Sequence, residues 1–213
     1  YLADLDFFLF YLSPDTPVEL VGHSMGDNVV MLYAGLRPQR IRRLINLEGF
    51  GMPDMSPELA PKRYVEWFDA LKKPARLKDY ASLQEVADRL KSTNPLLRDS
   101  HARWLAQHWA HEVAGRWVLN ADPAHKRPQP LLYRLPEVLI FFSRITAPVL
   151  FVEGNQTLYF MLFNGKYSRE EFLERAKHVP QFTLATLTDA GHMLHHDQPE
   201  ALAQLMAGFL LPS

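Results

Sequence analysis

The sequence feature that most constrains this chain is a serine flanked by glycines at residues 22–26, Gly-His-Ser-Met-Gly. Apolar residues at positions 18, 20 and 21 lead directly into it, and apolar residues recur at helical spacing as far as Leu36. This pattern predicts a strand, a tight turn and a helix. A serine on such a turn is held in a strained conformation with its hydroxyl exposed, and Gly22 and Gly26 would let strand and helix approach closely.

The segments around this turn extend the pattern. Residues 1–12 carry leucines on one helical face, at positions 2, 5, 9 and 12, and a Ser-Pro-Asp-Thr-Pro cluster then ends the helix. A short apolar run at residues 43–47 predicts the next strand, with Glu48 at its carboxyl end. Catalytic groups in open α/β sheets lie at the carboxyl ends of strands, which makes Glu48 a candidate site residue.

The pattern of predicted secondary structure differs between the middle of the chain and its two ends. From about residue 51 to residue 144, helical patterns follow one another with no strand between them, over residues 61–71, 82–90 and 95–113. Strand and helix patterns alternate again from residue 147 to the last helix, which begins at Pro199. This alternation predicts an α/β fold, with a mostly parallel sheet covered by helices on both faces.

Composition excludes several function classes. Lys plus Arg number 23 against 24 for Asp plus Glu, so no basic surface suggests a nucleic-acid partner. The chain has no cysteine, which excludes disulfides, thiolate catalysis and cysteine-based zinc sites. Its longest apolar stretch, residues 7–12, is too short to span a bilayer, and no signal peptide is visible. We therefore expect a cytoplasmic protein with no membrane span, while the oligomeric state stays unknown.

Four motifs resemble those of the α/β-hydrolase superfamily from residue 1 to the C-terminus: G-H-S-M-G at 22–26, N-L-E-G-F at 46–50, A-P-V-L-F-V-E-G at 147–154 and A-G-H-M-L-H-H-D-Q-P at 190–199. The resemblance implies a hydrolase core formed by residues 1–50 and 146–213, with an inserted helical cap at residues 51–145. Cap aromatics would line an apolar pocket or form the cap core, namely Trp67, Phe68, Trp104, Trp109 and Trp117.

The family's first strands, and the loop that supplies half of its oxyanion hole, would lie upstream of Tyr1. The chain is therefore expected to be the C-terminal part of a longer hydrolase, with an exposed apolar edge at the strand before Ser24. The backbone N–H of Met25 would be one oxyanion donor. Because one missing donor costs on the order of 3 kcal/mol, we expect this chain alone to be a poor catalyst.

A serine nucleophile needs a base, and the base needs an orienting acid. His192 follows the last strand, at residues 182–187, and Gly191 beside it would suit a sharp loop. For the acid, many α/β-hydrolases use an Asp shortly after the strand that here ends at Glu153-Gly154, but this chain has Asn-Gln-Thr-Leu there. A second branch, similar to haloalkane dehalogenases, carries a Glu where this chain has Glu48, so Glu48 is the predicted acid. An alternative is that Glu48 only binds loop amides.

Other histidines are interpreted as structural. His23, on the turn, would point away from Ser24 and pack, and His195 and His196 would begin the next helix. His108 and His111 would share a helical face near His101, but no further ligand has convincing spacing for a metal.

The predicted function is a Ser24-His192-Glu48 hydrolase that forms an acyl-enzyme, without metal or organic cofactor. Its partner would be a small-molecule ester of a small to medium apolar acid. Two alternatives stay open: a C–C bond hydrolase or cofactor-free perhydrolase with the same triad, and a catalytically incomplete fragment or binding module. The dehalogenase and epoxide hydrolase reactions are disfavoured, because they need an Asp nucleophile in place of Ser24.

Overall fold

The computed structural model describes residues 1–211, and their contacts divide them into two compact units. The first unit contains residues 1–53 and the chain from Arg134 onward. The second unit contains Asp54–Tyr133. Each unit has its own sheet and hydrophobic core, and each is described by itself.

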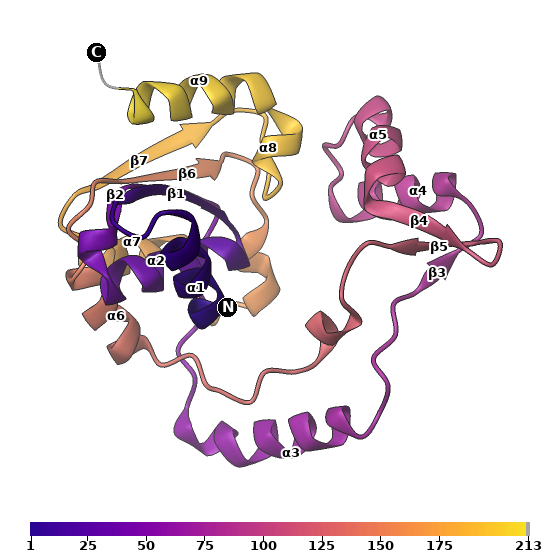
Figure 1. The fold of residues 1–213 in the computed structure, drawn as a ribbon, viewed down its shortest axis with the longest axis horizontal. Helices are drawn as coiled ribbons and strands as arrows, with labels where there is room; N and C mark the ends of the chain where they lie inside the picture. The colour runs from indigo at the N-terminus through magenta and orange to yellow at the C-terminus, as the bar shows by residue number, and fades with distance from the viewer. Residues whose placement is uncertain (212–213) are drawn as a thin grey trace. The chain divides into compact units, whose positions relative to one another are not determined.

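The first unit is built on a parallel sheet with the strand order β1-β2-β6-β7 (Figure 1). The strands are β1 (Val18–His23), β2 (Ile41–Leu47), β6 (Val149–Gly154) and β7 (Phe182–Leu187), and every neighbouring pair is parallel. All six residues of the central strand β6 are buried. The predicted α/β-hydrolase type of sheet is confirmed, because the strands alternate with helices along the chain.

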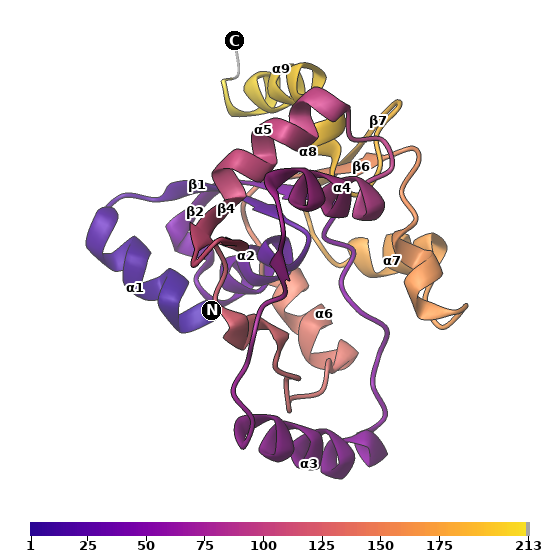
Figure 2. The same ribbon diagram turned by 90° about the vertical axis from the view of Figure 1, so that its right-hand side faces the viewer.

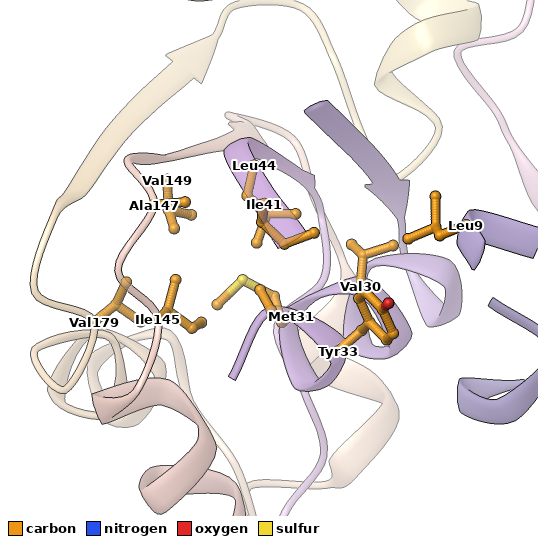
Figure 3. Packing of buried hydrophobic residues seen from close by; sticks show 11 residues of the cluster. Leu9, Val30, Met31, Tyr33, Ile41, Leu44, Ile145, Ala147, Val149 and Val179 are labelled. Carbon is orange, nitrogen blue, oxygen red and sulfur yellow. The ribbon is translucent and has the colours of Figure 1, made fainter. Parts of the chain in front are cut away.

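Helices cover both faces of this sheet, and Figures 1 and 2 place α2 and α9 on opposite sides of it. Alternate residues of a strand point to opposite faces, so Leu44 and Val149 pack toward α2, while Ile45 and Leu150 pack toward α9. Figure 3 shows the core on the α2 side. The helices of this unit are α1 (Leu2–Leu12), α2 (Met25–Leu36), α6 (Leu135–Ser143), α7 (Arg169–Ala176), α8 (Leu194–Asp197) and α9 (Pro199–Leu210), with short 3-10 turns at Pro38–Arg40 and Tyr159–Phe163.

The strand β1 forms one edge of the described sheet, since its ladder partner there is β2 alone. Val21 on this strand is 43% exposed. The leucine face of α1 packs on the core near α2 through Leu9, which is buried, and through Leu2 and Leu5, which are partly buried. Leu12, the last residue of the helix, is 72% exposed.

The second unit combines helices with a small antiparallel sheet of order β3-β5-β4. Its elements are α3 (Ala60–Leu71), β3 (Asp79–Tyr80), α4 (Leu83–Thr93), α5 (Asp99–Trp109), β4 (Ala110–Val113) and β5 (Arg116–Leu119), with 3-10 turns at Pro57–Leu59 and Pro123–Lys126. The expectation that no strand lies between the helices of this segment was therefore wrong. The helix predicted over residues 95–113 spans only α5, because residues 110–113 pair with β5 in a hairpin.

The helix α4 begins with a Ser-x-x-Glu capping pattern at residues 82–85. The Ser82 hydroxyl accepts a hydrogen bond from the Glu85 N–H at 3.2 Å, as the capping pattern predicts. Of the predicted cap aromatics, Trp117 packs against the core of α4 and α5, while Phe68, Trp104 and Trp109 are exposed. Trp67 on α3 is half-buried.

The limits of the insertion differ from the predicted 51–145 at its C-terminal end. The helix α6 belongs to the first unit, where it packs closely against α2. A Cβ atom at Gly35 would lie 2.3 Å from the Phe141 carbonyl oxygen, so the helix backbones nearly touch. The role of residues 54–133 as a cap stays a prediction. Within residues 1–211, no helix combines the length and the apolarity that crossing a bilayer requires.

Candidate active site

The carboxyl ends of the parallel strands bring together the three side chains that were predicted to react. Ser24 follows β1, Glu48 follows β2, and His192 lies in the loop after β7. Because all four strands run in the same direction, these residues meet at one edge of the sheet.

The contacts between these side chains form a continuous chain. The Nε2 atom of His192 lies 2.9 Å from the Oγ atom of Ser24. On the other side of the imidazole, Nδ1 lies 3.1 Å from the Oε2 atom of Glu48. Glu48 is fully buried, whereas the His192 side chain is 31% exposed.

These contacts determine where the protons lie when His192 is neutral. An ionised carboxylate can only accept hydrogen bonds, so Nδ1 of His192 carries the proton that is donated to Glu48. The Nε2 atom then has a free lone pair, and it accepts the hydroxyl proton of Ser24. This arrangement can remove the proton from Ser24 while the resulting imidazolium stays beside a buried anion.

Both Ser24 and Glu48 adopt left-handed backbone conformations, with φ of 53° and 56°. Such conformations cost on the order of 1 kcal/mol or more for a residue with a Cβ, so the surrounding structure must hold them. The backbone N–H of Ser24 donates to Leu47 O at 2.9 Å, and the N–H of Glu48 donates to Val152 O at 3.0 Å. Each residue is thus fixed to the neighbouring strand.

The close approach of helix and strand at this turn depends on Gly22 and Gly49. A Cβ at Gly22 would lie 2.5 Å from Asp27 Cα, and a Cβ at Gly49 would lie 2.1 Å from Asp27 Oδ2. A Cβ at Gly26 would meet nothing within 4 Å. The predicted packing role of Gly26 was therefore wrong, because the helix meets the sheet through Asp27.

Asp27 is a fully buried carboxyl on the first turn of α2, and sequence reasoning missed it. Neither of its oxygens makes a hydrogen bond of ordinary geometry. Burial raises the pKa of Asp27 well above its usual range, and the nearby Asn46 amide offsets only part of that rise. A neutral Asp27 places no negative charge beside the helix N-terminus that follows Ser24.

Both carboxylate oxygens of Glu48 accept further hydrogen bonds. The N–H of Gly154 donates to Oε1 at 2.7 Å, and the hydroxyl of Thr157 donates to Oε2 at 2.6 Å. Sequence reasoning noted residues 155–158 only as a loop without a carboxylate. No local pattern marks Thr157 as a donor to Glu48, because the two residues lie 109 positions apart in the sequence.

His23 contacts the backbone of His192, which the prediction of a packing role did not foresee. Its Nε2 atom lies 2.8 Å from the His192 carbonyl oxygen, so Nε2–H is the donor. The His23 ring centroid also lies 5.1 Å from that of His192 and 4.5 Å from that of His195. Burial lowers the pKa of His23, which keeps the ring neutral beside the base.

His195 and His196 lie in α8, in the first helix after His192, as predicted. Burial, reinforced by the neighbouring imidazoles of His196, His23 and His192, lowers the pKa of His195 to about 3. The ring is therefore neutral at physiological pH, and it adds no positive charge next to His192.

The loop before His192 turns at a residue other than the predicted glycine. Asp189 has the left-handed conformation, with φ of 52°. Gly191 instead donates its N–H to the Asp197 carboxylate at 3.0 Å, which ties the loop to α8.

The ring of Tyr159 stacks on His192 with centroids 5.4 Å apart and planes at 28°.

Met25 is the first residue of α2, and its side chain is 54% exposed. The first N–H groups of a helix lack acceptors within the helix, so the N–H of Met25 is available to a ligand near Ser24. An oxyanion formed on the carbon that Ser24 attacks would develop next to this position.

The remaining predicted histidines do not form a common site. His108 ends α5 and its Nδ1 atom contacts Trp104 O at 2.7 Å, whereas His111 lies in β4 and contacts Asn120 at 2.6 Å. The expectation that both lie on one helical face was wrong, because the helix ends at Trp109. Over the described part of the chain, no group of three or more His, Cys, Asp or Glu side chains could hold a metal ion.

Comparisons with known proteins show that the chain as a whole is similar to hydrolases. A sequence model of the alpha/beta hydrolase family matches residues 2–205. The mouse sn-1-specific diacylglycerol lipase ABHD11 is 27% identical over 203 residues, which cover 91% of this chain and 59% of the relative. The Escherichia coli esterase YbfF is 24% identical over 196 residues, covering 89% of this chain and 66% of the relative.

Among solved structures, a thioesterase domain from the curacin biosynthetic pathway has a TM-score of 0.76 and 25% identity. The match covers 97% of this chain and 70% of that chain. The chain spans 59% of the length of the mouse lipase and 60% of the length of a serine hydrolase-like protein from Danio rerio. It therefore corresponds to only part of these relatives.

Proposed function

The chain belongs to the alpha/beta hydrolase family, and from this we propose that it is a serine hydrolase that cleaves carboxylic esters through an acyl-enzyme. Ser24 is the nucleophile, His192 is the general base and then the general acid, and Glu48 orients the imidazole. The continuous contacts from Ser24 through His192 to Glu48 carry this proposal.

The reaction follows from the proton positions. Ser24 Oγ attacks the ester carbonyl carbon while its proton passes to Nε2 of His192. The carbonyl oxygen becomes an anion beside the N–H of Met25, and collapse of this intermediate expels the alcohol, which takes the proton from His192. Water, deprotonated by the same nitrogen, then attacks the acyl-enzyme. The Oγ–acyl bond breaks, Ser24 Oγ takes the proton back from His192, and the acid is released.

The substrate class rests on two kinds of support. The similarity to a diacylglycerol lipase and to an esterase favours an ester with an apolar acyl group. Beside the imidazole, the ring of Tyr159 stacks on His192 with centroids 5.4 Å apart, which gives this side of the site an aromatic character. We propose acyl esters of small to medium length as substrates.

The test is hydrolysis of p-nitrophenyl acetate, butyrate and hexanoate by the purified protein. Ser24→Ala is expected to lower kcat by about 10³-fold or more, because no other group can form the acyl-enzyme. Ser143→Ala is the matched control, since that hydroxyl bonds the Ile140 carbonyl on α6 and is exposed. Equal hydrolysis by wild type and Ser24→Ala would overturn the proposal.

A further inference from the structure

Thr157 lies in the loop after β6, and its hydroxyl touches the carboxylate that is proposed to orient the base. The Thr157 Oγ1 atom lies 2.6 Å from Glu48 Oε2. This oxygen is also the one that faces His192 Nδ1, at 3.1 Å. One carboxylate oxygen is therefore shared between the imidazole and a hydroxyl from another segment of the chain.

The direction of the Thr157 proton is fixed by its surroundings. The carboxylate can only accept, so the hydroxyl must donate to it. The N–H of Tyr159 lies 3.4 Å from the same Oγ1 atom and donates to it, which leaves the hydroxyl proton for Glu48. The N–H of Thr157 also donates to the Gly154 carbonyl oxygen at 3.2 Å, so the loop itself is held at this position.

From these contacts the geometry points to Thr157 as a positioning residue for the Glu48–His192 pair. The inference rests on the proposed function, in which Glu48 orients His192. The Gly154 N–H holds Oε1 and the Thr157 hydroxyl holds Oε2, so the two donors fix the rotation of the carboxylate about its terminal bond. Hydrogen bonds to an ionised group are about twice as strong as neutral ones, and burial strengthens them further.

The second effect of Thr157 is electrostatic. Its hydroxyl withdraws negative charge from the oxygen that accepts the His192 proton. Without the hydroxyl, Oε2 would attract the imidazolium more strongly, and the base would release its proton less readily to the leaving alcohol. Thr157 thus sets both the direction and the strength of the interaction between Glu48 and His192.

The same loop also holds the other member of the pair. The ring of Tyr159 stacks on His192, and its hydroxyl donates to the Gly51 carbonyl oxygen at 2.6 Å. The loop of residues 154–159 therefore contacts the acid through Gly154 and Thr157, and the base through Tyr159.

The test compares Thr157→Val, which keeps the shape and removes the hydroxyl, with Thr157→Ser, which keeps the hydroxyl. For Thr157→Val we expect the plateau kcat to fall about 10-fold with KM unchanged, and the midpoint of the acid limb of the pH profile to rise by about half a pH unit. Thr157→Ser is expected to restore both values to within about threefold and within about 0.2 pH units of wild type. Identical profiles for wild type and Thr157→Val would overturn the inference, and so would a Thr157→Ser variant as impaired as Thr157→Val.

A second readout does not depend on turnover. The proton on Nδ1 of His192 gives a low-field NMR resonance, and its position reports the strength of the hydrogen bond to Glu48. Thr157→Val is expected to move this resonance to lower field, while Thr157→Ser leaves it in place. If the resonance shifts as expected but wild type hydrolyses no ester, the positioning role stands and the proposed reaction fails. If the resonance does not shift, the positioning role fails whatever the activity.

Discussion

The Oγ atom of Ser24 and the Nε2 atom of His192 lie 2.9 Å apart, although 168 residues separate them in the sequence. Neither residue is placed by its immediate neighbours alone. Ser24 is fixed to β2 through the Leu47 carbonyl, and the loop before His192 is fixed to the end of β6, where the Gln156 N–H donates to Ala190 O at 2.8 Å. The parallel sheet is therefore what aligns the proposed nucleophile, Ser24, with the proposed base, His192.

The role of Glu48 is tested by replacing it with the neutral isostere. Glu48→Gln is expected to lower kcat by about 10³ to 10⁴-fold, because the amide no longer selects the tautomer that accepts the Ser24 proton. Glu153→Gln is the matched control: Glu153 also ends a strand and is 4% exposed, but it pairs with Arg169 at 2.6 Å and does not contact the imidazole. Ester kinetics on both variants decide the assignment, and equal losses in both would count against Glu48 as the acid.

The proposed oxyanion donor at position 25 is a backbone N–H group, so the Met25 side chain should matter little to kcat. Met25→Ala is expected to change kcat by less than about threefold, since the Met25 side chain is largely exposed. Replacement of residue 25 by the corresponding α-hydroxy acid, which exchanges N–H for O, should lower kcat by about 10² to 10³-fold. If the backbone replacement leaves kcat unchanged, the N–H of Met25 stabilises no oxyanion.

Asp27 makes the stability of the protein depend on pH. Burial raises its pKa above the unfolded value near 3.8, so folded and unfolded states are equally neutral below that pH. As the pH rises further, the unfolded chain loses this proton while the folded chain keeps it, and the free energy of unfolding falls. Asp27→Asn is therefore expected to raise the free energy of unfolding by on the order of 1–3 kcal/mol at about pH 7, and by much less at about pH 4.

Urea denaturation at both pH values measures this difference. Asp15→Asn, at an exposed turn position, is the control and should show no such pH-dependent gain. A gain for Asp27→Asn that is the same at both pH values would contradict a neutral buried carboxyl at this position.

His195 gives the free energy of unfolding the opposite pH dependence. Its pKa is lowered to about 3 by burial and by the neighbouring imidazoles, while an unfolded histidine takes up a proton near 6.5. The stability that the neutral ring contributes is present above the unfolded value and is lost as the pH falls from there toward 3. We expect His195→Gln to lose less stability than wild type between about pH 7 and pH 5. His178→Gln, at an exposed position, is the control, and a matching effect in both variants would refute the account.

The sequence predicted the parts of the site that local patterns mark. Ser24 is flanked by glycines between a strand and a helix pattern, Glu48 ends an apolar run, and His192 follows the last strand. Each signal depends on residues within a few positions, so each can be recognised without the fold.

The parts that were missed depend on contacts between distant segments. Thr157 meets Glu48 across 109 residues, and nothing in the segment around Thr157 indicates that partner. Asp27 looks like an ordinary acidic residue in the first turn of a helix, and its burial follows from the approach of Gly22 and Gly49.

The small sheet of the second unit was missed for a different reason. The hairpin of β4 and β5 turns at Ala114 and Gly115, which both have positive φ, of 50° and 76°. Such a turn is usually marked by Asn or Asp before the glycine, and alanine there gives a weak signal. In addition, no residue after Trp109 and before Gly115 marks the end of the helical pattern that precedes the hairpin.

The most direct measurement of the central claim is covalent labelling with a fluorophosphonate, which reacts with a serine that an adjacent base activates. Mass spectrometry of the labelled protein locates the adduct, with Ser24→Ala, Glu48→Gln and His192→Ala as comparisons. The account predicts an adduct on Ser24 that is absent in Ser24→Ala and forms at least about 10²-fold more slowly in the other two variants. An adduct on another serine, or none on a folded sample, would contradict it.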